Sequence, residues 1–319
     1  LGKRGLALAA ALRPVIADIE IVGHDKAPEA ARKAVELKLV DKTEWNLLAA
    51  CEGARLVIIA IPQSGLEQTL RAIGSELEPG AIIVDLCPNK VASLAAAGVV
   101  AEAVTYISSD LILNPARSEA GDPRPGSAAL RGAVWTLSPR QGSTSEGVDA
   151  MVGIIAQMDA HPMMMEPAEH DGSRLALNAV PVALGFALVS AVSSDNAWKD
   201  RKWLAGDPFS LATPSVGDAE SAELARALIA DPAATRHWLN QVMLQLMAMR
   251  DAVDSGDETA LIARLKGAAD AREEWLSEWR RGRNPDRGAS NVKAPSILGT
   301  FMGESLAGKL RGGGKPGKA

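Results

Sequence analysis

The first residues of the chain carry two glycines and a later carboxylate at a spacing that suits the phosphates and ribose of a dinucleotide. Gly2 and Gly5 flank Lys3 and Arg4, and Asp25 follows 20 residues after the second glycine. As the second and third glycines of a G-x-G-x-x-G turn, they allow the backbone at a helix N-terminus to approach a pyrophosphate. An acidic residue at this distance accepts hydrogen bonds from the adenosine ribose. Its charge would repel an additional 2′-phosphate, which favours NAD over NADP as the cofactor.

The start of the chain allows two interpretations of these glycines. Residue 1 is Leu rather than Met, and the sequence does not include the first glycine of the motif or the strand before it. We therefore expect an upstream strand of roughly ten residues, given typical strand lengths. The alternative is a secretory signal, because Lys3 and Arg4 precede an apolar run. A small-residue cleavage site followed by an independent start is missing, and this favours the nucleotide interpretation.

Apolar runs in the first half predict the sheet that must position this motif. The expected strands cover residues 19–22, 54–62, 80–85, 133–137 and 160–165, and the helices between them cover residues 64–77 and 147–158. Continuous apolar strands that alternate with helices are typical of a doubly wound parallel sheet. The fold class predicted for residues 1–165 is therefore an α/β Rossmann-type dinucleotide-binding domain. Residues 115–132, rich in Gly, Pro, Ser and charge, are expected to form a surface loop or lid.

The second half has a helical period throughout. Expected helices cover residues 169–194, 219–229, 235–252 and 258–280, and they predict an all-α dimerisation and substrate domain at residues 166–281. Residues 175–194 carry no charge and are long enough to span a membrane. Asn178, Pro181 and three serines within them instead favour a helix buried between two subunits, and hence a homodimer without a membrane partner. The basic tail, residues 282–319, is expected to be disordered.

Composition restricts the class of protein further. The 319 residues are 47% hydrophobic and 23% charged, which is typical of a soluble globular protein. A formal net charge of −5 argues against a general nucleic-acid binder. Cys51 and Cys87 are the only cysteines, and their spacing suits neither a zinc site nor a disulfide framework. We therefore predict a cytoplasmic protein with no metal site.

A nucleotide-binding sheet domain followed by a helical domain resembles the prephenate/arogenate dehydrogenase family. The similarity covers roughly residues 1–275. The residues that carry it are Gly2-Lys3-Arg4-Gly5, Val22-Gly23-His24-Asp25, Ile59-Ala60-Ile61-Pro62, Asp85 with Lys90, and residues 166–171 and 206–213.

This resemblance implies an activity and a set of ligands. The family oxidises a cyclohexadienol ring with NAD(P) in tyrosine biosynthesis, and the ring loses carbon dioxide and becomes aromatic. The substrate is then a small-molecule carboxylate, and Ile61 and Pro62 belong to the cofactor site. The chemistry needs a hydride acceptor over the ring carbon and a polar group to take the proton of the ring hydroxyl.

The chain departs from the family pattern at four places. Asp110 stands where the family has its catalytic histidine, and Pro88 stands where it has a serine. A helical His-Leu-Pro-His falls on residues 179–182, and a substrate-binding Thr-Arg falls on Thr213 and Pro214. Asp110 is the candidate catalytic base if burial raises its pKa, and a loop carboxylate without a catalytic role is the alternative.

Arg174 and Asn178 are the candidate substrate-binding residues. They resemble the Lys-x-x-x-Asn of related hydroxy-acid dehydrogenases. Arginine cannot replace that lysine as a proton donor, but its guanidinium can bind a carboxylate through two hydrogen bonds. Two hypotheses follow: an NAD-linked dehydrogenase of this ancestry, acting on prephenate or on another small carboxylate, and a catalytically silent dinucleotide-binding dimer with a sensing or scaffolding role.

Overall fold

The computed structural model describes residues 1–16, 19–116 and 130–282. The chain divides into two compact units: unit 1 comprises Leu1–Pro167 with Arg272–Ala319, and unit 2 comprises Ala168–Ala271. The basic tail predicted at residues 283–319, and residues 117–129 of the predicted loop, lie outside the described residues. The domain boundaries expected from the sequence stay predictions.

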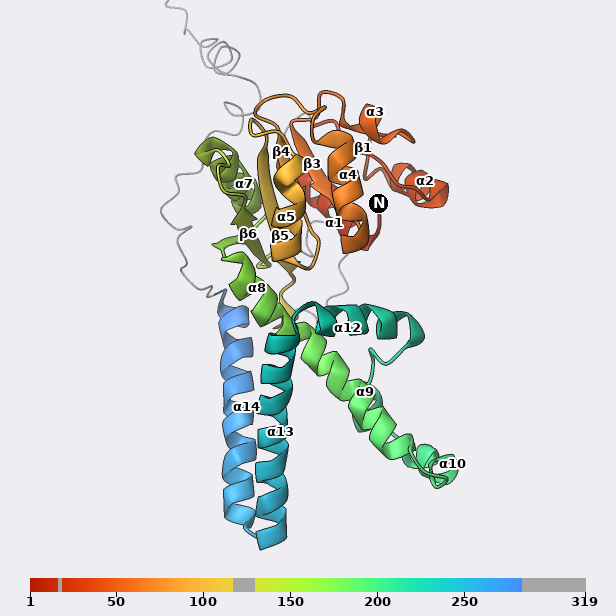
Figure 1. Ribbon diagram of the computed structural model, residues 1–319, viewed down its shortest axis with the longest axis vertical. Coiled ribbons are helices and arrows are strands. Elements are labelled where there is room, and N and C mark those ends of the chain that lie inside the picture. Colours follow the sequence, from red (N-terminus) through yellow and green to blue (C-terminus); the bar gives the residue numbers. More distant parts are fainter. Residues whose placement is uncertain (17–18, 117–129, 283–319) are drawn as a thin grey trace, which may run out of the picture. The chain divides into compact units, whose positions relative to one another are not determined.

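Unit 1 alternates short helices with strands over most of its length (Figure 1). Its strands are β1 (Val22–Gly23), β2 (Lys42–Thr43), β3 (Leu56–Ile59), β4 (Ile82–Asp85), β5 (Thr105–Ile112), β6 (Val134–Pro139) and β7 (His161–Met164). Its helices are α1 (Lys3–Leu12), α2 (Pro28–Glu36), α3 (Leu47–Cys51), α4 (Leu66–Ile73), α5 (Lys90–Ala96) and α7 (Ser145–Gln157), with single 3₁₀ turns at Gln63–Gly65 and Ala97–Val99.

The strands form two sheets. One sheet has five strands in the order β3-β4-β5-β6-β7, and the other pairs β1 with β2 in parallel. Within the larger sheet only the pairing of β5 with β6 is antiparallel. The outer edges of β3 and of β1 have no paired strand among the described residues. The carboxyl ends of β3, β4 and β5 therefore meet at one edge of the sheet.

Helices cover both faces of the larger sheet, as a doubly wound fold requires. On one face, α1 and α7 pack against apolar side chains of β4, β5 and β6, with Trp135 and Leu137 fully buried. On the other face, α4 packs through Leu66, Leu70 and Ile73. Helix α1 also contacts the smaller sheet, because Ala9 belongs to a cluster with residues that flank β1 and β2. The predicted α/β class is confirmed.

Helix α7 packs closely against β5. Thr144 caps its N-terminus by accepting a bond from Gly147 N at 3.2 Å, and the Thr144 hydroxyl lies 2.9 Å from the Thr105 hydroxyl. A Cβ added to Gly147 would lie only 2.3 Å from Thr105 Oγ1. Glycine at this position therefore permits the helix to approach the strand.

Unit 2 is helical throughout, and this part of the prediction is also confirmed. Its elements are α8 (Pro167–Arg174), a π-helical turn at Leu175–Ala179, α9 (Val180–Ser193), α10 (Trp198–Arg201), a 3₁₀ turn at Lys202–Leu204, α11 (Asp207–Ala212), α12 (Asp218–Ala230), α13 (Pro232–Ser255) and α14 (Glu258–Arg281), whose last turns belong to unit 1. Gly256 reverses the chain between α13 and α14 in the left-handed conformation, at φ 66°. Arg264 donates to Gln245 across the resulting hairpin at 3.0 Å.

The long apolar helix predicted at residues 169–194 is present and contains a π-helical turn at Leu175–Ala179. Pro181 has no N–H to donate to the preceding turn, and the π-helical turn lies directly before it. The stretch Pro167–Ser193 has a mean hydropathy of 2.1 and is long enough to cross a membrane by length and composition, which is weak evidence of a span. In this chain only 17% of its apolar window is buried.

Three strands differ from the sequence prediction. Strands β2 and β5 are absent from it; β5 is the longest strand among the described residues, and Ser108, Ser109 and Asp110 interrupt its apolar run. Strand β1 is shorter than the expected residues 19–22: Ile21 N donates to the Asp41 carboxylate at 2.7 Å instead of to a neighbouring strand.

Candidate functional site

The N-terminus of α1 lies at the carboxyl ends of three strands. Leu1 contacts the end of β1, since its side chain would lie 2.9 Å from a Cβ added to Gly23. A Cβ added to Gly5 would lie 3.9 Å from Ala60 Cβ, directly after β3. The Arg4 guanidinium donates to Leu86 O, directly after β4, at 3.5 Å. We call this region, where the first turn of α1 meets residues 23–25, 60–63 and 86–89, the carboxyl edge.

The first turn of α1 is suited to an anion. Gly2 is the N-cap in an extended conformation, no side chain caps the helix, and the first turn contains no acidic residue. A Cβ added to Gly2 would meet no atom within 4 Å, so the space beside this turn is open. Peptide N–H groups and the positive end of the helix dipole face such a space. The predicted pyrophosphate site therefore fits the residues present.

Asp25 lies where the sequence predicted, just beyond the end of β1. Its Oδ1 accepts a bond from Ala27 N at 2.8 Å, and this bond favours the charged form of the carboxylate. The carboxylate is therefore charged at neutral pH and can accept hydrogen bonds from a ribose diol.

Residues after β3 and β4 are joined to each other at the same edge. Ile61 O accepts a bond from the Cys87 thiol at 3.5 Å, and the Gln63 side chain accepts a bond from Asn89 N at 3.1 Å. Pro62 precedes the 3₁₀ turn that leads into α4. The structure thus brings Ile61 and Pro62 to the region that holds Gly2, Arg4, Gly5 and Asp25. Lys3 contributes the first residue of α1.

A buried polar network supports this edge, and the sequence pattern gave little sign of it. Asp85, at the end of β4, accepts bonds from the Tyr106 hydroxyl at 2.7 Å, the Ser93 hydroxyl at 3.1 Å and Cys87 N at 2.9 Å. All four residues are buried. Burial, followed by the charge of Asp85, raises the pKa of Cys87 to about 12. The same two causes raise the pKa of Tyr106, so both groups stay protonated and neutral.

Lys90 ties the end of β4 to β5. Its ammonium donates to the carbonyl oxygens of Cys87 and Ser109, and the residue is fully buried. Ser109 in turn donates to Thr136 O at 2.6 Å and accepts a bond from the Trp135 indole. A buried ammonium is costly unless it is paired and hydrogen-bonded. The bonds of Lys90 therefore fix the spacing of the strand ends on which the edge is built.

Asp110 is a strand residue, unlike the loop carboxylate that the sequence left as an alternative. It lies in β5 opposite Thr136 and is 1% exposed. Its backbone N donates to Thr136 Oγ1 at 3.1 Å, and its Oδ1 accepts a bond from Leu111 N at 3.0 Å. Ser108 pairs with Asp85, so Asp110 stands level with Cys87 at the carboxyl edge. Its role as a base stays a prediction.

Arg174 and Asn178 belong to unit 2. Arg174 ends α8, and Asn178 is exposed in the π-helical turn that follows. Departures from regular α-helix of this kind often occur at functional sites. Substrate binding by these residues stays a prediction. Among the residues that the structure describes, no group of three or more His, Cys, Asp or Glu side chains is placed to hold a metal ion.

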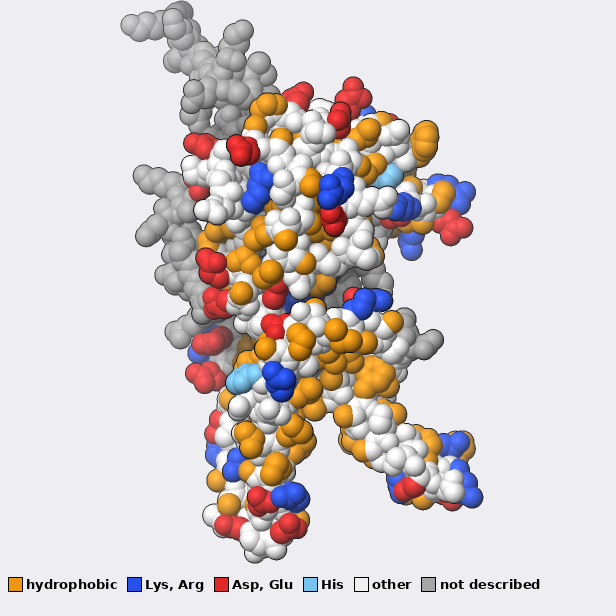
Figure 2. All heavy atoms as spheres, in the orientation of Figure 1, with side chains coloured by type: hydrophobic (Ala, Val, Ile, Leu, Met, Phe, Trp, Pro, Cys, Tyr) orange, Lys and Arg blue, Asp and Glu red, His pale blue; other side chains and the backbone are white. Residues whose placement is uncertain are grey.

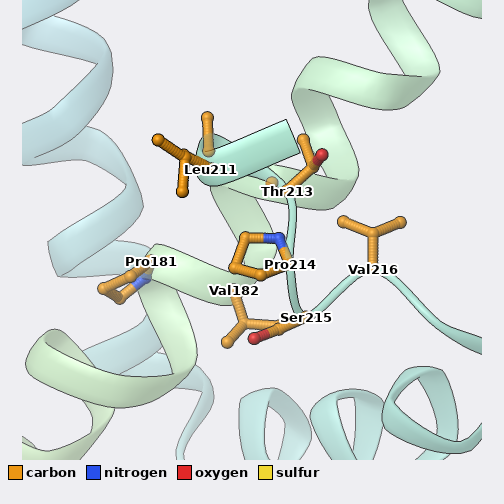
Figure 3. Close-up of a pocket in the computed structure, with 9 residues that line it drawn as sticks. Pro181, Val182, Leu211, Thr213, Pro214, Ser215 and Val216 are labelled. Atoms are coloured by element: carbon orange, nitrogen blue, oxygen red, sulfur yellow. The ribbon is translucent and has the colours of Figure 1, made fainter. Parts of the chain in front are cut away.

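A pocket of about 220 Å³ lies within unit 2 between the start of α9 and the segment after α11 (Figure 3). It is lined by Pro181, Val182, Gly185, Leu211, Ala212, Thr213, Pro214, Ser215 and Val216. These include the two segments that the resemblance assigns to the substrate. No lining residue is charged, and the Thr213 hydroxyl donates to Phe209 O at 2.7 Å. The pocket therefore offers a carboxylate no cation.

This chain is similar in sequence to known proteins. Residues 8–164 match the sequence profile of a family described as prephenate dehydrogenase, nucleotide-binding domain. Prephenate dehydrogenase of Bacillus subtilis is 28% identical over 194 residues, which are 59% of this chain and 51% of that protein. The chain thus spans about half the length of this curated relative.

Solved structures share the fold of both units. Prephenate dehydrogenase of Aquifex aeolicus, in complex with hydroxyphenyl propionate and NAD⁺, superposes with a TM-score of 0.69 at 16% identity and covers 85% of this chain and 94% of its own. Synechocystis arogenate dehydrogenase also gives a TM-score of 0.69, at 19% identity, and covers 86% of this chain and 96% of its own. Residues 8–164 therefore belong to the prephenate dehydrogenase nucleotide-binding family, and the chain as a whole has the fold of prephenate and arogenate dehydrogenases.

Proposed function

We propose that this protein is an NAD-linked dehydrogenase of prephenate/arogenate dehydrogenase ancestry that acts on a small carboxylate, with little or no activity on prephenate itself. One observation carries the proposal: the uncapped first turn of α1, with open space at Gly2, meets the charged Asp25 at the carboxyl edge. The bound dinucleotide of a family relative supports the same assignment.

Different residues of the carboxyl edge bind different parts of NAD. Peptide groups of Gly2, Lys3, Arg4 and Gly5 hold the pyrophosphate, and Asp25 accepts bonds from the ribose diol. Ile61 and Pro62 limit the space beside the cofactor at the end of β3. NADP binds less well because its extra phosphate meets the charge of Asp25, although Lys26 is exposed beside it. When bound, NAD supplies the hydride acceptor.

Three residues carry the proposed substrate chemistry. Asp110 takes the proton of the substrate hydroxyl, and this requires a rearrangement that admits substrate to a carboxylate that is 1% exposed. Arg174 binds the substrate carboxylate through two hydrogen bonds, and Asn178 donates a third.

A second copy of the chain is the partner that unit 2 requires. Large apolar side chains are exposed along its helices (Figure 2). They include Leu177, Leu184, Leu188, Met243, Leu244, Leu246 and Met247. Apolar surface of this extent marks an interface on a soluble protein. We therefore include in the proposal a cytoplasmic homodimer formed through α9 and the helices α13 and α14.

A second function is favoured by the pocket of unit 2. Its lining residues lack charge, and Val182 and Pro214 stand at positions that the resemblance assigns to polar substrate contacts. A protein that binds the dinucleotide without turning over prephenate would match this lining. The rival is thus a silent dinucleotide-binding dimer with a sensing or scaffolding role.

Two measurements on the purified full chain separate these functions. Calorimetry with NADH tests the cofactor site, and NADH formation from NAD with prephenate, arogenate or another hydroxy acid tests turnover. Binding together with turnover of any of these substrates supports the dehydrogenase. Binding without turnover of any substrate supports the silent dimer, and absence of binding rejects both.

A further inference from the structure

Trp45 is the most exposed large apolar side chain of unit 1 among the residues that the structure describes. The indole is 87% exposed, whereas the next, Leu113, is 53% exposed. Tryptophan is usually well buried because its ring system is large and mostly apolar. An indole that is almost entirely in water is available to a ligand, and its place in the fold decides which one.

The backbone around Trp45 is held in place although its side chain is exposed. Glu44 N donates to Gly23 O at 2.9 Å, and Glu44 O lies 2.9 Å from His24 Nδ1. On the other side, the Asn46 side chain accepts bonds from Leu48 N at 2.8 Å and Ala49 N at 3.2 Å. Both neighbours of Trp45 are thus fixed, which holds the backbone from which the indole projects.

Strand register places Trp45 beside the predicted ribose site. Gly23 of β1 pairs with Thr43 of β2 in a parallel ladder. Asp25 and Trp45 each stand two residues beyond this pair, at the same end of the two strands. In a dinucleotide the ribose is bonded to the pyrophosphate on one side and to the base on the other. With the pyrophosphate at α1 and the ribose at Asp25, the base continues toward β2.

We propose that Trp45 is a stacking platform for the purine of the dinucleotide, and that this protein recognises the base by its face rather than by its edge. The proposal rests on the dinucleotide site described under the proposed function. Stacking tolerates any purine because every base has an aromatic face. His24 Nδ1 and Asn46 Oδ1 are already engaged with the protein. A platform of this kind is expected to discriminate little between purines.

Trp45→Ala and Trp45→Phe test the platform by calorimetry with NADH and with ADP-ribose. Trp45→Ala is expected to weaken both ligands by about tenfold or more, and Trp45→Phe, which keeps an aromatic face, by no more than about threefold. Trp203→Ala is the matched control, because Trp203 is 80% exposed in unit 2; it should leave both affinities unchanged. Equal affinity of Trp45→Ala and wild type for both ligands would overturn the platform.

Recognition by the face is tested separately with the analogue that carries hypoxanthine in place of adenine. It should bind wild type within about threefold of NAD, and a loss of about 30-fold or more would overturn edge-independent recognition.

The proposed activity and the platform fail in distinguishable ways. Binding of ADP-ribose that depends on Trp45, in a protein that turns over no substrate, leaves the platform standing and rejects the dehydrogenase. Wild type that binds neither NADH nor ADP-ribose rejects both. Trp45 is exposed, so unchanged thermal unfolding of Trp45→Ala is expected and excludes loss of fold as the cause.

Discussion

The carboxyl edge of unit 1 and the pocket of unit 2 differ in what their residues offer a ligand. The edge combines peptide groups, a charged carboxylate and strand ends fixed by the buried Lys90 and Asp85. The pocket is lined by small and apolar side chains without a charge. The edge has features suited to a dinucleotide, while the pocket lacks a charged group that would pair with a carboxylate. We therefore expect cofactor binding and substrate turnover to be separable in this chain.

The largest expected effect concerns turnover of prephenate. Activity should be absent, or at least about 100-fold below that of a relative that keeps the histidine, because a positioned general base contributes about 10² to 10⁴ in rate. Pro214 in place of arginine also removes a charge-assisted contact worth about 1.5–3 kcal/mol. The two losses act on one substrate and need not add. Steady-state NADH formation measures the combined effect.

Turnover of prephenate at an ordinary rate would contradict the contrast drawn between the carboxyl edge of unit 1 and the pocket of unit 2. Asp110 would then be the working base, and Asp110→Asn should abolish turnover without changing the affinity for NAD. Activity that survives this substitution would show that another residue takes the proton, and would reject the assignment of Asp110.

Association of two chains is the next largest effect. Leu188→Glu places a charge on α9, where Leu188 is 39% exposed, and should convert a dimer at micromolar concentration into a monomer. Leu37→Glu is the control, because Leu37 is 52% exposed in unit 1. Deletion of residues 282–319 should leave the dimer intact. Sedimentation measures the association state of all three variants. A monomeric wild type would contradict the proposed interface.

The preference for NAD over NADP tests the role of Asp25 at the carboxyl edge. Asp25→Ala should weaken NAD binding about tenfold to 100-fold, since hydrogen bonds to a charged group contribute about 1.5–3 kcal/mol, and should reduce the preference for NAD over NADP. Glu67→Ala, an exposed carboxylate on α4, should change neither. Competition calorimetry with NAD and NADP gives both values. Tighter binding of NADP by wild type would contradict the role of Asp25.

The smallest expected effect tests whether the buried polar network around Cys87 is closed to solvent. Burial raises the pKa of Cys87 to about 12, whereas an unfolded thiol titrates near about 8.5. The folded state holds this proton more tightly, so the stability from the neutral thiol is complete below about pH 8.5 and is lost as the pH rises toward 12. Denaturant unfolding across this range should show the decline, and Cys87→Ala should reduce it. Rapid thiol modification of native protein at pH 8 would contradict a closed network.

Local patterns predicted most of the fold. The apolar run before Pro62 and the run that ends at Asp85 indicated β3 and β4, because strands buried on both faces leave little room for polar residues. The helices of unit 2 followed from their period and from breaks such as the one at Gly256. The short motif at Gly2 and Gly5 indicated the start of α1, where the structure also begins a helix.

The rest of the site depends on contacts between distant residues, which a single sequence does not display. Tyr106 and Asp85 are 21 residues apart, and their hydrogen bond requires the pairing of β4 with β5. Strand β5 itself carries Ser108, Ser109 and Asp110, whose polarity conceals a buried strand until their partners are known. Trp45 gave no signal for the same reason, because only its exposure and strand register distinguish it from a core tryptophan.

The contact between Gly147 and Thr105 has a consequence for how unit 1 opens. The Thr105 hydroxyl meets the cap of α7, and the side-chain-free surface at Gly147 lies directly on it. Sliding of helix α7 along β5 would disrupt the Thr144 cap, so we expect the two elements to exchange their amide hydrogens as one cooperative unit. Local opening of α7 and β5 is then expected to be concerted, so protease cleavage within α7 would also report the opening of β5.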